Sequence, residues 1–174
     1  MDVLAEEPRE DYEVRFLPLY SPEAEAYGAE VAPALVVNRK LLVEGIPSVE
    51  EIKALIQKAR PISLGIILTK SPAGSEEAEN ALDTALESLA IGNRVGLFLL
   101  SDGVWLAKGG QMGPVAARLT DMIERGGEVL CSGEHLKAAG LTSDRLAPGV
   151  AVADDGFGRL VELIMEEWDK VITF

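Results

Sequence analysis

The sequence predicts an α/β protein: a three-layer α/β/α unit with a mostly parallel five-stranded sheet, preceded by a small, partial α+β unit. From residue 61 to residue 174, short apolar runs alternate with segments of helical periodicity, the pattern of a parallel sheet covered by helices. Residues 1–60 hold only a hairpin pattern, a possible strand and short helical segments. The composition, 48% hydrophobic and 26% charged residues, is typical of a folded globular chain. We therefore expect two units, 1–60 and 61–174.

The most specific local pattern of the first unit is a capping box, with Ser48 as the cap and Glu51 three residues later. It predicts a helix that begins at Val49 and ends before Pro61, because a residue that precedes proline avoids helical geometry. The other elements expected here are a short strand at 13–17, a brief helix at 21–27, and a hairpin with strands at 34–37 and 41–43 and a turn at 38–39.

Five apolar runs predict the strands of the second unit, at residues 62–68, 95–100, 128–131, 149–153 and 171–174. The segments between them predict helices that begin at Ser75, at Pro114, after Cys131 and at Asp154 or Asp155. In the last helix, one inward face is expected to hold the apolar residues Phe157, Leu160, Val161, Ile164, Met165 and Trp168.

Charge and residue counts exclude several classes of function. Sixteen basic residues against 29 acidic ones give a net charge of −13, so we expect neither nucleic acid nor an anionic membrane as a partner. One cysteine and one histidine cannot form an intramolecular disulfide or a multi-histidine metal site, and no metal or organic cofactor is expected. No apolar run approaches the roughly 20 residues of a membrane helix, and the first residues are acidic, so a cytoplasmic protein is predicted.

Ligands of open α/β sheets bind at the loops that follow the carboxyl ends of strands, here residues 69–75, 101–113 and the segment from Cys131. None of these loops carries the glycine pattern of a dinucleotide-binding motif or a P-loop. A small-ligand site at the first two loops is therefore an open alternative without a motif behind it.

Asp102 and Gly103 directly follow a predicted buried strand. The carboxylate at that position would orient a ligand or a partner's thiol, or the Asp-Gly pair would simply form a turn. Trp105 and Leu106 are apolar residues in a predicted loop, which suggests contact with another subunit or a lid over the site.

Cys131 is the strongest candidate for a reactive residue, because it ends a predicted strand and Ser132 and Gly133 then begin a helix. The positive end of a helix favours the thiolate, which is the nucleophilic form of cysteine. His135 would stabilise the thiolate if it shared a helix face with Cys131, whereas Glu134 would oppose a second negative charge. The alternatives are an inert, buried cysteine and a solvated histidine.

The second unit, over about residues 61–174, resembles the DsrE/DsrF-like (TusD-like) sulfur-relay proteins. The features that carry the resemblance are, in chain order, the strand 62–68 with its Ser/Gly loop, Ser101-Asp102-Gly103-Val104, Val129-Leu130-Cys131, and the closing strand 169–174. The resemblance implies an α/β/α fold and homo-oligomers. In sulfur-carrying members it also implies a cysteine that accepts a persulfide from a donor protein, a role that maps onto Cys131.

Residues 1–60 resemble the C-terminal half of a small thioredoxin-like domain. Residues 31–38 match the segment with the cis-proline, so Pro33 is expected to be cis, and 43–45 with 48–56 match the last strand and helix. The first strand and the C-x-x-C helix are absent, so redox activity of this unit is excluded. We expect it to serve as a docking or dimer-forming layer.

Three functions follow from these observations. The leading one is a sulfur carrier or sulfurtransferase that passes a persulfide from a donor protein to an acceptor. The second is a non-catalytic, homo-oligomeric binding or assembly module, and the third is a small-ligand-binding protein. The residues expected to form the relay site are Cys131 as nucleophile, with His135, Asp102, Gly103, Ser132 and Gly133 in support.

Overall fold

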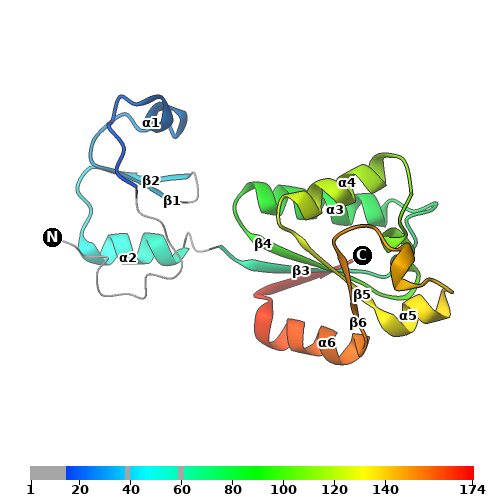
Figure 1. The fold of residues 1–174 in the computed structure, drawn as a ribbon. Coiled ribbons are helices and arrows are strands. Elements are labelled where there is room, and N and C mark those ends of the chain that lie inside the picture. The colour runs from blue at the N-terminus through cyan, green and yellow to red at the C-terminus, as the bar shows by residue number, and fades with distance from the viewer. Residues whose placement is uncertain (1–14, 38–39, 59–60) are drawn as a thin grey trace. The chain divides into compact units, whose positions relative to one another are not determined.

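A computed structural model describes residues 15–37, 40–58 and 61–174. The chain forms two compact units, Met1–Arg60 and Pro61–Phe174, and each is described by itself (Figure 1). Within the described residues, no helix combines the length and the apolar character that crossing a membrane requires.

In its described residues, the first unit contains an antiparallel hairpin and two helices. The predicted capping box is confirmed: the Ser48 N–H donates to the Glu51 carboxylate at 2.8 Å, and the Glu51 N–H donates to Ser48 Oγ at 3.2 Å. The elements of the first unit are α1 (Pro22–Ala26), β1 (Ala34–Val37), β2 (Lys40–Glu44) and α2 (Val49–Lys58). The strand expected at 13–17 is not formed in its described part, residues 15–17, and the turn at 38–39 lies outside the described residues.

The segment before the hairpin is held by Glu44 and Gly45. The predicted cis peptide bond at Pro33 is present, between Ala32 and Pro33. The Glu44 carboxylate accepts hydrogen bonds from the N–H groups of Glu30 and Val31, at 2.6 and 2.9 Å, and these bonds lower its pKa. The Gly45 N–H donates to the Pro33 carbonyl at 2.8 Å.

The second unit is built on a five-stranded sheet in which every neighbouring pair is parallel, and this confirms the predicted fold class. The strand order is β6-β5-β4-β3-β7. The central strands β3 and β4 are buried on both faces, as their continuous apolar runs predict. The strands are β3 (Ser63–Leu68), β4 (Arg94–Leu99), β5 (Glu128–Ser132), β6 (Val150–Ala153) and β7 (Lys170–Thr173).

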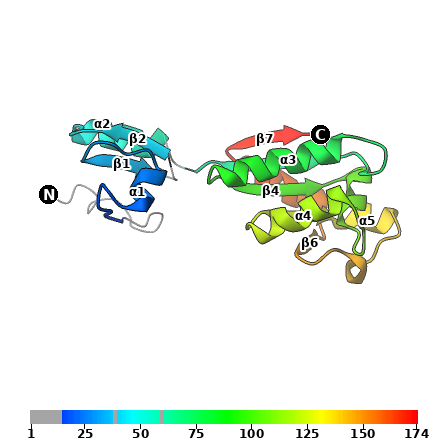
Figure 2. The same ribbon diagram turned by 90° about the horizontal axis from the view of Figure 1, so that it is seen from above.

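The helices cover the two faces of this sheet unequally (Figures 1 and 2). α3 (Glu77–Ala90) and α4 (Pro114–Glu124) lie on one face, and α5 (Gly133–Ala138) follows β5. α6 (Gly156–Glu162), extended by a π-helical turn at Leu163–Glu167, covers the other face. Crossovers between parallel strands are right-handed, so the three successive crossovers from β3 to β6 place their helices on one side of the sheet. The return from β6 to β7 runs the opposite way and places α6 on the other side.

Two hydrophobic cores result, one on each face. The larger core lies beneath α3 and α4 and includes Ile66, Leu97 and Leu99. The smaller core lies beneath α6 and contains Ile67, Phe98 and few other buried side chains. The helix α6 therefore covers one face of the sheet alone, whereas three crossovers cover the opposite face.

The structure departs from the expected loop at residues 101–113. Residues 101–107 form a 3-10 helix, η2 (Ser101–Ala107), which buries Leu106 in the larger core with Trp105 packed against it. Leu106 therefore completes the chain's own core, whereas Trp105 is only half-buried and its contact with another subunit stays a prediction.

In α6, Leu160 and Trp168 of the predicted inward face pack in the smaller core, together with Leu163. The other four residues of the predicted face are exposed: Phe157, Val161, Ile164 and Met165. Apolar residues surround more than half of this helix, so periodicity alone does not select the buried side. The π-helical turn also inserts an extra residue before Trp168, whose N–H donates to the Leu163 carbonyl.

Candidate functional site

The carboxyl end of β5 brings together most of the residues that the sequence singles out. Successive side chains of a strand point to opposite faces, so Cys131 and Ser132 project to different sides of the sheet. Cys131 pairs with Leu99 of β4 and Val152 of β6, and its side chain belongs to the larger core. It has no exposed surface.

Burial raises the pKa of the Cys131 thiol to about 12, because its surroundings disfavour the charged thiolate. The structure therefore places the thiol in the apolar core and not at the helix start where the sequence predicts it, and its role in sulfur transfer stays a prediction. Strand β5 continues one residue further than the sequence predicts, so Ser132 is the N-cap of α5 and Cys131 lies one residue inside the sheet. In this structure the His135 ring bonds to Ser132, whose side chain lies on the opposite face of the sheet from Cys131.

On that opposite face, Ser132 is the centre of a small hydrogen-bond network. Its Oγ–H donates to the Glu134 carboxylate at 2.8 Å. Oγ also lies 2.8 Å from Nδ1 of His135. Since the hydroxyl proton is directed to the carboxylate, we assign the tautomer in which Nδ1–H donates to Oγ.

Glu134 links this network to the next helix. Its two carboxylate oxygens accept hydrogen bonds from the Gly156 N–H at 3.1 and 3.0 Å, where α6 begins. Its own backbone N–H, the Ser132 hydroxyl and Gly156 together lower the pKa of Glu134. The carboxylate thus ties the start of α5 to the start of α6. This role was missed in the sequence, where Glu134 counts only as an obstacle to a thiolate.

The network has the residue types of a nucleophilic site, but its serine hydroxyl is not accessible to a substrate. Ser132 has no exposed surface, and its oxygen is engaged on both sides by Glu134 and His135. His135 is half-buried, and its ring meets Phe157 edge-on with ring centroids 5.7 Å apart. The arrangement can hold β5, α5 and α6 together, but it does not present a hydroxyl to a substrate.

The two predicted site glycines are required by close backbone approaches. A Cβ on Gly103 would overlap the Leu68 carbonyl at the end of β3, and one on Gly133 would lie 2.9 Å from the Ala153 carbonyl in β6. Asp102 is exposed at the same edge of the sheet, and its side chain makes no hydrogen bond or ion pair within the described part of the chain. The structure therefore does not join Asp102 to Cys131 in one site.

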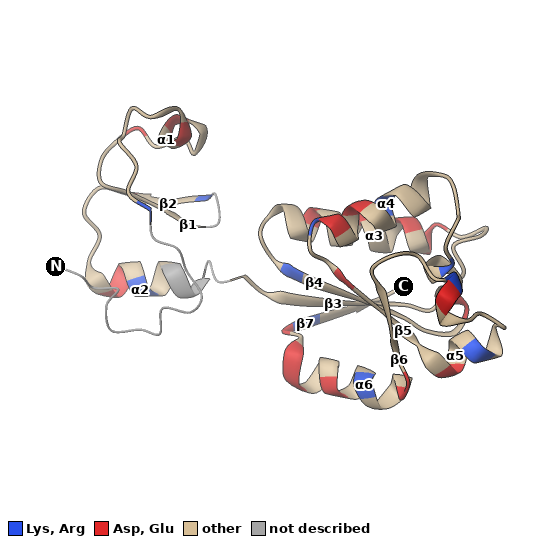
Figure 3. Ribbon diagram, viewed as in Figure 1, with Lys and Arg blue, Asp and Glu red and all other residues tan. Residues whose placement is uncertain are grey.

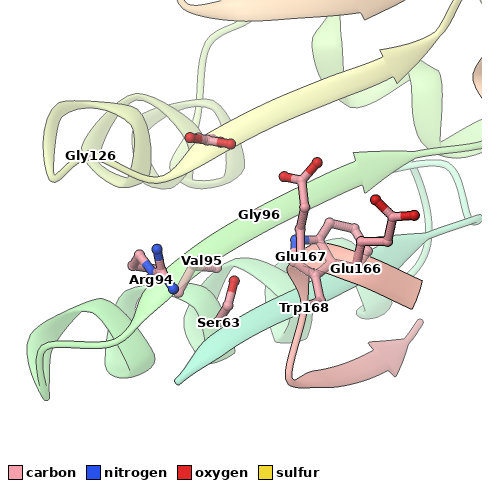
Figure 4. Close-up of a pocket in the computed structure, with 9 residues that line it drawn as sticks. Ser63, Arg94, Val95, Gly96, Gly126, Glu166, Glu167 and Trp168 are labelled. Atoms are coloured by element: carbon pink, nitrogen blue, oxygen red, sulfur yellow. The ribbon is translucent and has the colours of Figure 1, made fainter. Parts of the chain in front are cut away.

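A hollow of about 400 Å³ lies at the opposite edge, where strands β3 to β5 begin (Figure 4). None of its lining residues comes from the loops 69–75 or 101–113, where a ligand site was expected. The indole of Trp168 lies over the two glycines Gly65 and Gly96, which face each other in register on β3 and β4. The lining residues are Ser63, Arg94, Val95, Gly96, Gly126, Glu128, Glu166, Glu167 and Trp168.

Within residues 15–37, 40–58 and 61–174, no three His, Cys, Asp or Glu side chains come together in a group that could hold a metal ion. The candidate site is a hydrogen-bonded cluster on one face of β5, with the buried Cys131 thiol on the other face.

Two relatives match about two thirds of the chain. Two uncharacterised archaeal proteins, MK0008 of Methanopyrus kandleri and MJ0989 of Methanocaldococcus jannaschii, are each 35% identical to the chain over 113 residues. Each match covers 63% of this chain, and 91% and 96% of the respective relative.

Two solved structures share the fold. The Escherichia coli protein YchN aligns with a TM-score of 0.58 and 24% identity, over 65% of this chain and 99% of its own. MTH1491 of Methanobacterium thermoautotrophicum, a protein of unknown function, aligns with a TM-score of 0.57 and 17% identity, over 65% and 99%. The DsrE/DsrF-like family model, from a family associated with sulfur relay, matches residues 63–174. The chain therefore belongs to the DsrE/DsrF-like family.

Proposed function

We propose that this chain is a non-catalytic assembly subunit with the DsrE-like fold, in which Cys131 is a packing residue and carries no persulfide. The observation that carries the proposal is the complete burial of the only thiol among aliphatic side chains. The alternative of a sulfur carrier needs that thiol to be ionised and reachable.

The size of the pKa effect supports this choice. With a pKa of about 12, about one thiol in 10⁵ is ionised at pH 7, against a few per cent for a free cysteine. Attack on a donor's sulfur further requires that the Cys131 sulfur reach the partner, and the β5 end and α5 close it off from solvent.

Timed thiol labelling tests the proposal. In the native protein at pH 7.5, we expect a maleimide to label Cys131 negligibly over an hour, and in guanidinium chloride to label it fully within minutes. Mass spectrometry after incubation with thiosulfate or a glutathione persulfide is expected to show no added sulfur atom. Cys131→Ala is the control for any reaction elsewhere on the chain.

Persulfide relay is the second candidate, and the family's association with sulfur relay favours it. It requires a donor protein that opens the end of β5 when it binds, since Cys131 is only one residue from the strand's end. Rapid native labelling, or a gain of one sulfur that a reductant removes and Cys131→Ala abolishes, would replace the assembly proposal with this one.

A further inference from the structure

The hollow of about 400 Å³ at the amino edge of the sheet is lined by charges of both signs. Arg94 begins β4, Glu128 begins β5, and Glu166 lies in the π-helical turn after α6. Within the described part of the chain, none of these three side chains makes a hydrogen bond or an ion pair. The carboxylate of Glu167 differs, because it pairs with Arg159 at 2.6 Å. Figure 3 shows a basic position at the start of β4 and acidic positions at the end of the helix that continues α6.

The floor of the hollow is the face of the sheet that α6 covers. Ser63 and Gly65 on β3 pair in register with Arg94 and Gly96 on β4, and Gly96 pairs with Glu128 on β5. Successive side chains of a strand alternate between faces, so these positions share the face of the smaller core. At this end of the strands the floor therefore has no large apolar side chain. It offers two glycines, a hydroxyl and two opposite charges.

The hydroxyl of Ser63 is a buried polar group that opens into the hollow (Figure 4). Ser63 is 8% exposed, and its hydroxyl has no hydrogen-bond partner among the described residues. Its backbone is fixed, because the N–H donates to the Asp169 carboxylate and the carbonyl accepts from the Asp169 N–H, both at 2.8 Å. Water satisfies an exposed charge, but a buried hydroxyl without a partner carries a desolvation cost. This group is therefore available to a ligand in the hollow.

Trp168 forms the wall of the hollow, and its position is fixed. Its N–H donates to the Leu163 carbonyl at 2.8 Å, and the following residue is bonded to Ser63. The Nε1 end of the half-buried indole lies over Gly96, the residue in register with Glu128. A rigid aromatic surface with a few polar groups around it is typical of a preformed ligand site, and it suits an aliphatic chain.

We propose that this hollow binds a small zwitterion, in which an ammonium group and a carboxylate group are joined by a short aliphatic chain. The ligand's carboxylate pairs with the guanidinium of Arg94, and its ammonium group pairs with Glu128 and Glu166. The chain lies on the indole of Trp168, and the Ser63 hydroxyl hydrogen-bonds to one of the charged ends. The site goes beyond the proposed assembly role and does not depend on it.

Both charges of the ligand are needed, because the hollow lacks a partner for each sign. An acid alone would meet the carboxylates, and an amine alone would meet the guanidinium. Arg94 and Glu128 are one strand and two residues apart, so their Cα atoms are separated by about 8 Å. The volume of about 400 Å³ is at the low end of the roughly 300–1,000 Å³ of ligand pockets, which suits a molecule of amino-acid size.

Nuclear magnetic resonance of the full chain tests the proposal, because Trp168 and Trp105 are the only two sources of indole N–H signals. Trp105→Phe assigns the two signals. The probes are 3-aminopropanoate, 5-aminovalerate and 6-aminohexanoate, each added to about 20 mM at low salt. With at least one of them, we expect a saturating shift of the Trp168 signal at a Kd of about 1 mM or tighter, and an unchanged Trp105 signal. Pentanoate and pentylamine, which each carry one charge, should bind at least about tenfold more weakly.

Variants locate the binding in the hollow. Arg94→Gln and Glu128→Gln should each weaken binding of the zwitterion at least about tenfold. Lys137→Gln is the matched control, since it removes a charge from an exposed position of α5 and should leave the Kd unchanged. The same spectra report whether each variant is folded.

Three results would overturn the proposal. They are no shift of the Trp168 signal with any of the three zwitterions, binding that is equal in Arg94→Gln and the wild type, and pentylamine that binds as tightly as 5-aminovalerate. None of these results bears on the assembly role, because they measure binding at the hollow and not the state of the Cys131 thiol.

Discussion

The contact between Trp168 and the glycine pair of β3 and β4 gives the sharpest stability prediction. Gly65 and Gly96 face each other across the two central strands, and the indole of Trp168 lies directly over them. A Cβ on Gly65 would overlap the indole ring, whereas one on Gly96 would lie 2.9 Å from its Nε1. Replacing glycine by alanine inside a strand normally stabilises a protein by roughly 0.5–1 kcal/mol, so the sign of the effect is informative here.

We expect Gly65→Ala to lower the free energy of unfolding of the second unit. Displacing the half-buried indole exposes about 100 Å² of apolar surface, which costs roughly 2.5 kcal/mol, and overpacking of this kind costs roughly 1–3 kcal/mol. The net loss should be about 2–3 kcal/mol, a drop in melting temperature of about 8–12 °C for a unit of this size. Gly96→Ala, with the smaller overlap, should lose about half as much.

The assay is urea and thermal unfolding followed by circular dichroism, with Trp168→Ala and the double variant Gly65→Ala/Trp168→Ala completing a cycle. Once the indole is gone, Gly65→Ala should cost nothing further, so the two single effects should fail to add by about 2 kcal/mol. A neutral or stabilising Gly65→Ala would refute this contact between the Trp168 indole and the glycine pair. So would a double variant whose loss of unfolding free energy equals the sum of the two single losses.

Three further predictions concern the carboxyl edge of the sheet. Glu134→Gln should melt at a lower temperature than the wild type at pH 7. The pKa of Glu134 is lowered in the folded state, so its contribution is present above the unfolded pKa of about 4.5 and is lost as pH falls below it. A difference in melting temperature that does not shrink between pH 7 and pH 3 would contradict this. Cys131→Ser should unfold in urea about 1–3 kcal/mol more easily than Cys131→Ala, because a hydroxyl in the aliphatic core lacks a partner. Equal stability of the two would place the residue in a polar setting. Gly103→Ala should lose at least about 2 kcal/mol in the same assay, since its Cβ would overlap the Leu68 carbonyl, and a smaller loss would mean that η2 shifts freely.

Periodicity and end signals predicted most of the fold. Each predicted strand of the second unit is present within about two residues, because strands buried on both faces appear as continuous apolar runs. The Ser48–Glu51 capping box was also predictable, since its residues are neighbours in sequence. The network of Ser132, Glu134 and Gly156 was not, because Glu134 and Gly156 come from different crossovers.

The candidate site shows how small a shift separates two interpretations. A strand end is uncertain by a residue or two from sequence alone, and one more residue in β5 moves Cys131 from the end of the strand into the sheet. Ending the strand at Cys131 predicts a thiol at a helix start, and ending it at Ser132 buries that thiol. The sequence therefore identified the loop, and only the structure shows that Cys131 points into the larger core.

By itself the sequence determined the fold class, because alternating apolar runs and helical periods can bury their apolar surface only as a helix-covered parallel sheet. The tertiary structure alone decided which side of α6 faces inward, since a helix that is apolar around most of its circumference has no preferred side until it packs. The strand order made that choice: β7 lies beside β3, so the last crossover reverses direction and its right-handed path sets α6 alone on its face. The apolar side chains of Phe157, Val161 and Met165, on the outer side of α6, are exposed as a result.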